Sequence, residues 1–176
     1  IPIARCNEFN ALKEAGFKPA MGFPVARMKL NWNSFDAYLA SLKAKKRYNI
    51  RQKREKLEAP EITVEIIEDY APYSERLVEL WTNVAKRSNG YEHERLTSAY
   101  FESMSEYLKG RSHVVAIKQN GKIVAFGLNL IGDEEYFGVA EGLDYDVRDM
   151  YDLYANNIFE ALRVACELRK KTFNIG

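Results

Sequence analysis

Two stretches of this 176-residue sequence hold the side chains best suited to chemistry. The first is a basic run in which only Glu55 and Glu58 supply opposite charge. Such a run can hold the phosphates of a coenzyme, of a carrier-bound pantetheine arm or of tRNA, or it can be a solvated helix face. Arg47, Arg51 and Arg54 would share one face of a helix. The cations of the run are Lys43, Lys45, Lys46, Arg47, Arg51, Lys53, Arg54 and Lys56.

The second stretch surrounds Glu141. This carboxylate can take a proton from an attacking amine if partial burial raises its pKa toward neutrality; otherwise it is a solvated group at the end of a strand. Tyrosines crowd the same region and can serve as a leaving-group acid or as packing residues. They are Tyr136, Tyr145, Tyr151 and Tyr154.

Other chemistries find no support in the residue spacing. His93 and His113 have no Cys or Ser partner in a recognisable frame for nucleophilic catalysis. Cys6 and Cys166 lie far apart and outside metal-ligand spacings, so no metal site is expected. Cys166 falls on the apolar side of a predicted helix, where a free cysteine usually acts as a small buried hydrophobe.

Composition indicates one domain with a substantial core. Hydrophobic residues make up 47% of the chain, and 26 Lys and Arg residues nearly balance 25 Asp and Glu residues. This balance provides no global field to attract nucleic acid or an anionic membrane. No apolar run approaches the roughly 20 residues of a membrane span, and no signal peptide is recognisable. We therefore expect a cytoplasmic protein.

Hydrophobic periodicity predicts alternating helices and strands. Ser34 is the expected N-cap of a helix at 35–42, and Asn120-Gly121 is a turn that requires left-handed residues between the two strands of a hairpin. Asn89-Gly90 is expected to stop one helix. Helices are predicted at 8–15, 35–42, 45–58, 72–88, 98–108 and 150–168, and strands at 25–30, 62–67, 113–118, 123–130, 135–140 and 172–175.

This order of elements implies a mixed sheet. The three strands from His113 to Ala140 follow one another through short turns and form an antiparallel meander. A long helix then leads to the strand 172–175, and a strand–helix–strand crossover within one sheet is expected to be parallel and right-handed. We therefore expect an α+β, three-layer fold whose mostly antiparallel sheet contains one parallel pair.

The order and several local segments resemble the GNAT acyltransferases, within them the FemAB-like and BioF2-like group linked to peptidoglycan biosynthesis or recognition. The segment Phe35 to Arg51 is similar to the "sfeaylaslskkrrrnlrr" opening of that group. The segments 114–127, 153–162 and 173–176 are similar to its central hairpin, third helix and following strand. The resemblance covers most of the chain from Phe35 onward.

The resemblance also implies a domain plan. Residues 1–33 are similar to the junction that follows a preceding unit, and residues 34–176 to a GNAT-like domain without its C-terminal strands. The sequence opens on Ile1-Pro2 and stops at Gly176 directly after an apolar strand. We therefore expect both ends to be cut from a longer polypeptide that pairs this domain with a second GNAT-like one, and the usual GNAT acid to lie beyond Gly176.

A site follows from the same resemblance. It would place the backbone N–H groups of Val139 and Ala140 nearest the acyl carbonyl, with Glu141 as the base and Tyr145 as a further catalytic candidate. Donor contacts are expected from Arg148 and Tyr151, and from Arg47 and Arg51 in the basic run. The loop before the third helix departs from the GNAT phosphate loop, because Asp144, Asp146 and Asp149 would repel a pyrophosphate.

The resulting expectation is an enzyme that moves an acyl group other than an aminoacyl group onto a small-molecule amine. Its donor would be acyl-coenzyme A or, given the acidic loop, an acyl carrier protein. Two alternatives stay open: a tRNA-dependent aminoacyl transferase of the Fem type, and a non-catalytic GNAT-like half of a twin-domain protein.

Overall fold

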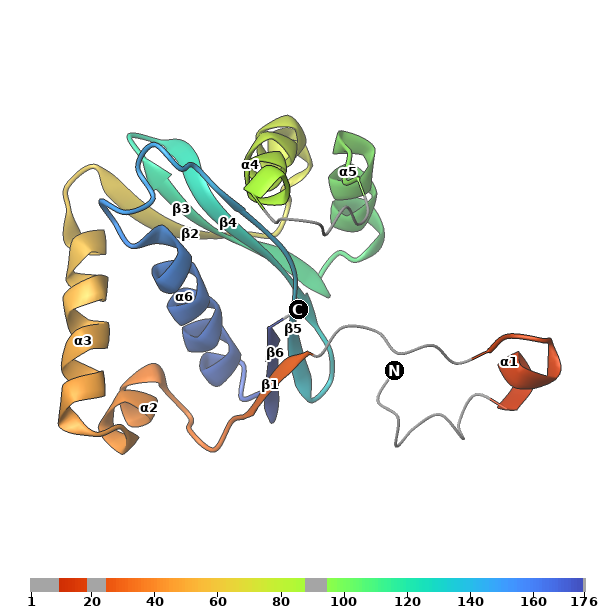
Figure 1. The fold of residues 1–176 in the computed structure, drawn as a ribbon, viewed down its shortest axis with the longest axis horizontal. Helices are drawn as coiled ribbons and strands as arrows, with labels where there is room; N and C mark the ends of the chain where they lie inside the picture. The colour runs from red at the N-terminus through yellow and green to blue at the C-terminus, as the bar shows by residue number, and fades with distance from the viewer. Residues whose placement is uncertain (1–9, 19–24, 88–94, 176) are drawn as a thin grey trace.

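The computed structural model describes residues 10–18, 25–87 and 95–175, and it contains a six-stranded sheet with helices on both faces (Figure 1). The strand order is β1-β6-β5-β4-β3-β2, and every pair is antiparallel except β5 with β6. The predicted mixed sheet is therefore confirmed. The strands are β1 (Ala26–Lys29), β2 (Ile62–Ile67), β3 (Ser112–Gln119), β4 (Lys122–Ile131), β5 (Glu135–Leu143) and β6 (Thr172–Ile175).

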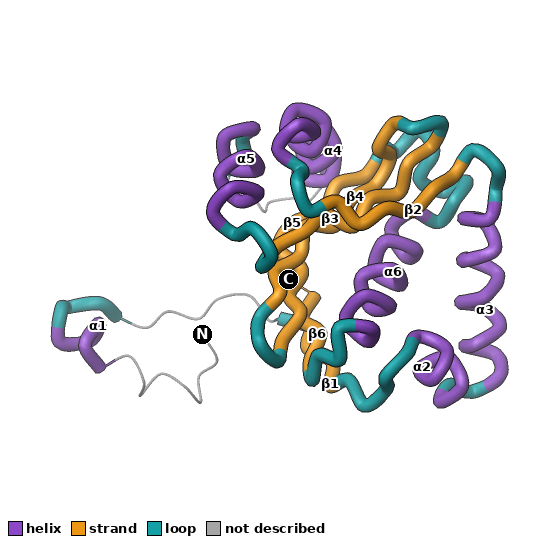
Figure 2. Tube along the Cα trace, turned by 180° about the vertical axis from the view of Figure 1, so that it is seen from behind, coloured by secondary structure: helices purple, strands orange, loops and turns teal. Residues whose placement is uncertain are grey.

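The helices form a layer on each side of the sheet. Figure 2 shows α4 and α5 on one face and α6 on the other, with α2 and α3 beside α6. This arrangement separates two apolar cores, one under α4 and α5 and one under α6. The helices are α1 (Asn10–Glu14), α2 (Phe35–Ser41), α3 (Ala44–Glu55), α4 (Ser74–Arg87), α5 (Ser98–Tyr107) and α6 (Leu153–Glu167).

Several local signals act as expected. The Ser34 hydroxyl accepts a hydrogen bond from the Ala37 N–H at 3.1 Å and caps α2. Asn120 and Gly121 both have positive φ, 49° and 79°, in the turn between β3 and β4. The expected stop at Asn89-Gly90 lies outside the described residues.

Two helix boundaries differ from the prediction. The basic helix ends at Glu55, and a 3₁₀ turn, Lys56–Glu58, precedes Pro60. The helix expected from Met150 begins only at Leu153, because Asp152 takes a left-handed conformation with φ 47°. Such a residue cannot continue a right-handed helix. The loop between β5 and α6 therefore runs from Asp144 to Asp152, three residues later in the chain than predicted.

Strand β5 contains a β-bulge. Gly138 opposes Asn129 on β4, whereas Ala140 opposes Leu128, so Val139 is an extra residue without a partner on β4. A bulge bends its strand and increases the local twist. On its other side β5 pairs with β6 from Glu135 to Gly138, and Gly138 faces Ile175, the last residue that the structure describes.

Helix α4 fixes the far end of β5. A Cβ added at Gly142 would stand 2.2 Å from Cε1 of Phe126 and 2.7 Å from the backbone carbon of Leu80. Only glycine lets α4 and β4 approach the strand this closely. The preceding residue, Glu141, is thereby held in a defined position near the end of β5.

Candidate active site

A cavity of about 370 Å³ lies between α6 and strands β4, β5 and β6. Its walls are mostly apolar, and Glu141 and Tyr154 contribute polar groups. We call it the inner cavity. Its lining is Ala26, Gly127, Leu128, Asn129, Gly138, Val139, Ala140, Glu141, Tyr154, Asn157, Ile158, Ala161, Phe173 and Ile175.

A second cavity of about 340 Å³ adjoins the first. Glu141 and Tyr154 line both, so the two cavities meet at these side chains. We call it the outer cavity. Its other lining residues are Lys53, Leu143, Tyr145, Arg148, Asp149, Asp152 and Ala155.

The environment of Glu141 suits a general base. The side chain is half-buried, and its carboxylate has no hydrogen bond or ion pair among the described residues. Desolvation raises the pKa of Glu141, because burial disfavours the charged form. Burial, and then the nearby charge of Glu141, raise the pKa of Tyr154. A carboxylate with a raised pKa and no partner can accept a proton from a substrate.

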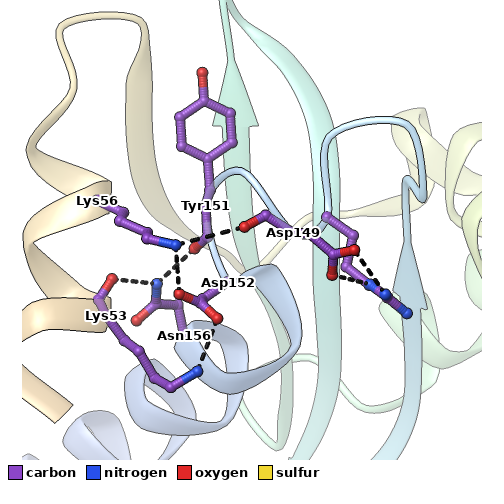
Figure 3. A network of polar contacts seen from close by, with 7 residues as sticks. Lys53, Lys56, Asp149, Tyr151, Asp152 and Asn156 are labelled. Carbon is purple, nitrogen blue, oxygen red and sulfur yellow. Dashed lines mark hydrogen bonds and ion pairs between the residues drawn. The ribbon is translucent and has the colours of Figure 1, made fainter. Parts of the chain in front are cut away.

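The start of α6 is occupied by an ion-pair network (Figure 3). Both carboxylate oxygens of Asp152 are taken, one by Lys53 Nζ at 2.7 Å and the other by Lys56 Nζ at 2.7 Å. Asn156 Nδ2 donates to the carbonyl oxygens of Lys53 at 2.8 Å and Tyr151 at 2.7 Å. Burial opposes ionisation of Asp152, but the two lysines outweigh it and lower the pKa of that carboxyl. The network joins α3 to α6.

The acidic loop is partly neutralised within the protein. Arg76 Nη2 pairs with Asp144 at 2.9 Å. Arg148 binds Asp149 through two hydrogen bonds of 2.7 and 2.9 Å. The cation expected to attract a donor phosphate is therefore already paired in this structure.

Tyr145 lies between two guanidinium groups. The Arg87 Cζ is 3.8 Å from the centre of the Tyr145 ring, and the Arg148 Cζ is 5.0 Å from it. Cations over the face of an aromatic ring are attracted by its quadrupole.

The structure brings most of the predicted site residues together. Val139 and Ala140 line the inner cavity, Glu141 lines both cavities, and Tyr145 and Arg148 line the outer one. Tyr151 lines neither. It is buried, and its hydroxyl donates to Glu61 Oε1 at 2.6 Å and accepts from Gln119 Nε2 at 2.9 Å.

The arginines of the basic run lie apart from these cavities. Arg47 donates to the carbonyl oxygens of Ala40 at 3.3 Å and Leu42 at 3.2 Å, at the end of α2. Arg54 pairs with the buried Glu160 at 2.6 Å and lies over the ring of Phe35.

Arg51, by contrast, is exposed. It lines a separate groove of about 460 Å³ beside α2, α3 and α6. The three arginines therefore have different surroundings, and their spacing on one helix does not bring them to a common site.

Two lining residues escaped sequence reasoning, namely Asn129 and Asn157. Both are almost fully buried, at 2% and 4% exposure. The sequence offered two signals for them. One is a polar residue on the apolar stripe of the last helix, and the other is the pair of glycines inside strands, Gly127 and Gly138. A glycine in a strand often marks a close approach by a ligand or another segment.

Away from the cavities, His113 and Tyr136 form a buried hydrogen-bonded pair. Burial lowers the pKa of His113 to about 4 and raises that of Tyr136. Such a histidine is neutral at physiological pH. Neither side chain lines either cavity, and the histidine has no catalytic partner beside it.

The mixed six-stranded sheet flanked by helices is similar to the fold of solved GNAT-type transferases. The solved structure of FemX aligns over all of this chain and 61% of its own, with a TM-score of 0.69 at 11% identity. An aminoglycoside acetyltransferase from an uncultured soil metagenomic sample aligns over 67% of this chain and 78% of its own, with a TM-score of 0.53 at 12% identity. These likenesses show the fold.

The chain belongs to the FemAB-like family, described as peptidoglycan biosynthesis/recognition, whose model matches residues 3–176. It is also 31% identical over 168 residues to the Mycobacterium tuberculosis protein named "Putative 8-amino-7-oxononanoate synthase 2". The alignment covers 94% of this chain and 22% of that protein. The chain thus spans about a fifth of the curated relative that it matches.

Within the described ranges, no helix is long and apolar enough to cross a membrane. Nor does that part of the chain contain a group of three or more His, Cys, Asp or Glu side chains arranged to hold a metal ion.

Proposed function

We propose that this domain transfers an acyl group from a thioester donor to an amine by direct attack, with Glu141 as the general base. The observation that carries the proposal is the β-bulge at Val139, which is followed by a desolvated carboxylate where an apolar cavity meets a polar one. The inner cavity would hold the acyl chain, and the outer cavity the thioester arm.

In the proposed reaction the amine nitrogen attacks the acyl carbon. Backbone N–H groups at Val139 and Ala140 would donate to the carbonyl oxygen as negative charge develops there. Glu141 accepts a proton from the attacking nitrogen. The carbon–sulfur bond then breaks, an amide remains, and the thiolate takes a proton and leaves as a thiol.

Tyr145 is our candidate for the acid that protonates this thiolate. It lines the outer cavity, where the sulfur would depart. The guanidinium groups of Arg87 and Arg148 lie over its ring.

The outer cavity favours an acyl carrier protein over coenzyme A as the donor. Its cations Lys53 and Arg148 are already paired with Asp152 and Asp149. A pyrophosphate would have to displace these carboxylates, whereas a carrier-bound pantetheine arm needs no pyrophosphate site. We further propose that the domain works beside a second GNAT-like unit.

The likeness to FemX favours a second candidate, transfer of an aminoacyl group from tRNA. Four exposed cations lie on or next to α3, namely Lys43, Lys45, Lys46 and Arg51. The three lysines form no ion pair with another described residue. These cations would contact the phosphates of the tRNA. Gel retardation by aminoacyl-tRNA at moderate salt, lost in an Arg51→Ala variant of the full-length protein, would favour this donor.

Thiol release tests the first proposal. The full-length protein is incubated with acyl-coenzyme A or acyl carrier protein and a panel of amines. Glu141→Gln should lower kcat/KM by about a hundredfold or more, the usual contribution of a general base. Glu106→Gln is the matched control, because Glu106 is an exposed glutamate of α5 on the other face of the sheet. Unchanged activity in Glu141→Gln would exclude Glu141 as the base.

A further inference from the structure

The inner cavity has a polar patch on a lining that is otherwise mostly apolar. Asn129 and Asn157 are almost fully buried there, and Asn157 Oδ1 has no hydrogen-bond partner among the described residues. Leaving a buried acceptor unpaired is unfavourable, because it has lost its hydrogen bond to water. A ligand in this cavity that offers a donor to Asn157 would restore a hydrogen bond.

Gly127 makes room for the Asn157 carboxamide. A Cβ added at Gly127 would stand 3.1 Å from Asn157 Nδ2 and 3.3 Å from its Oδ1, so the Asn157 side chain lies directly against β4. Asn129 is itself held in place, because its Nδ2 donates to the Gly127 carbonyl at 2.8 Å. The patch is therefore held against the sheet and leaves the cavity open.

Position distinguishes Asn157 from other buried asparagines. Asn156 and Asn174 also carry an unpaired Oδ1, but neither lines either of these cavities. Asn156 has a clear role in the fold through its bonds to the Lys53 and Tyr151 carbonyls. The side-chain nitrogen of Asn157 has no hydrogen bond to another described residue either. Among the described residues no hydrogen bond uses this carboxamide, and it lines the cavity proposed for the acyl group.

We propose that Asn157, supported by Asn129, selects acyl groups whose chain carries a hydrogen-bond donor, a hydroxyl or an amino group, over unsubstituted alkyl chains. The inference rests on the proposed function, because it takes the inner cavity as the acyl site. Beside an alkyl chain, Asn157 Oδ1 would stay buried without a hydrogen bond. A hydroxyl or amino hydrogen would donate to Oδ1.

The test measures binding of pantetheine thioesters, which share the arm of both proposed donors. Calorimetry on the full-length protein compares the thioester of butyrate with thioesters carrying a hydroxyl or an amino group at each chain carbon in turn. At least one substituted chain should bind about ten- to a hundredfold tighter than butyrate, the effect of one buried hydrogen bond. Asn157→Leu should bring that ratio close to one.

Asn174→Leu is the matched control, because Asn174 is equally buried and unpaired but lies outside the cavity, so this variant should keep the ratio. Equal binding of all chains by the unmodified protein would overturn the inference and leave the acyl site intact, and that result needs no folded variant. If no thioester binds, the proposed function fails, and the inference with it. A hydroxyl-only or an amino-only preference identifies which donor the acyl chain carries.

Discussion

Replacing Gly142 with alanine tests how tightly α4 holds the end of β5. The new methyl carbon would stand 2.2 Å from Phe126 Cε1 and 2.7 Å from both the backbone carbon and the Cβ of Leu80. The ring of Phe126 can move, but the backbone of α4 moves only with the whole helix. Overpacking of this kind costs about 1–3 kcal/mol, and two backbone-level clashes place Gly142→Ala near 3 kcal/mol.

Urea unfolding and thermal melting check this value. For a domain of this size, about 3 kcal/mol lowers the melting temperature by roughly 6–12 °C. Gly138→Ala is the matched control in the same strand, because its nearest contact is an ordinary 3.5 Å. It should change the free energy of unfolding by less than about 1 kcal/mol. If both variants were equally stable, the close packing of α4 on β5 would be refuted.

Three further predictions concern titration and the α3–α6 network. Desolvation raises the pKa of Glu141, so kcat/KM should rise with pH through a carboxyl pKa above the usual range, and a pH–rate profile of Glu141→Gln should lack that limb. The pKa of His113 falls from 6.5 to about 4. The unfolded chain therefore binds the extra proton first, and stability falls from about pH 6.5 downward, by up to about 3 kcal/mol below pH 4. His113→Gln should flatten that dependence in urea titrations at several pH values, and an unchanged slope would contradict the assignment. Asp152→Asn keeps a residue that tolerates left-handed φ but removes the charge between Lys53 and Lys56. Urea unfolding should show a free energy of unfolding lower by about 1 kcal/mol, a modest change because these groups are partly exposed. A free energy of unfolding that matches the unmodified protein would show that the network does not stabilise the fold.

The same raised pKa of Glu141 has a consequence for stability. A buried carboxyl binds its proton more tightly in the folded state, so the free energy of unfolding decreases as pH rises from the unfolded pKa of about 4.3 through the folded one. Glu141→Gln should therefore be more stable than the unmodified protein at neutral pH. A catalytic group commonly costs stability in this way.

Local patterns in the sequence predicted most of the elements. The stripe from Tyr73 to Val84 indicated an amphipathic helix, and Asn120-Gly121 indicated the turn of a hairpin. These signals act between residues close in the chain, so spacing reveals them. The parallel pair followed from the handedness of a strand–helix–strand connection.

The site depended on contacts that spacing does not contain. The bulge at Val139 is a property of the register between β4 and β5. Asp152, in its left-handed conformation, pairs with Lys53 and Lys56, which lie nearly a hundred residues earlier in the chain. Sequence periodicity also left open which side of the basic helix packs. The structure shows Arg54 paired with a buried glutamate of α6, whereas Arg51 faces solvent.

The central claim is that the bulge polarises the acyl carbonyl through the N–H of Val139. Isotope-edited infrared spectroscopy of a bound thioester measures this directly, because hydrogen bonds lower the carbonyl stretching frequency. Proline is tolerated at bulges, so Val139→Pro removes one of the two proposed donors, while Val139→Leu keeps both. We predict a lowered frequency in the unmodified protein and in Val139→Leu, and a return toward the free value in Val139→Pro. An equally lowered frequency in a folded Val139→Pro protein would contradict the claim.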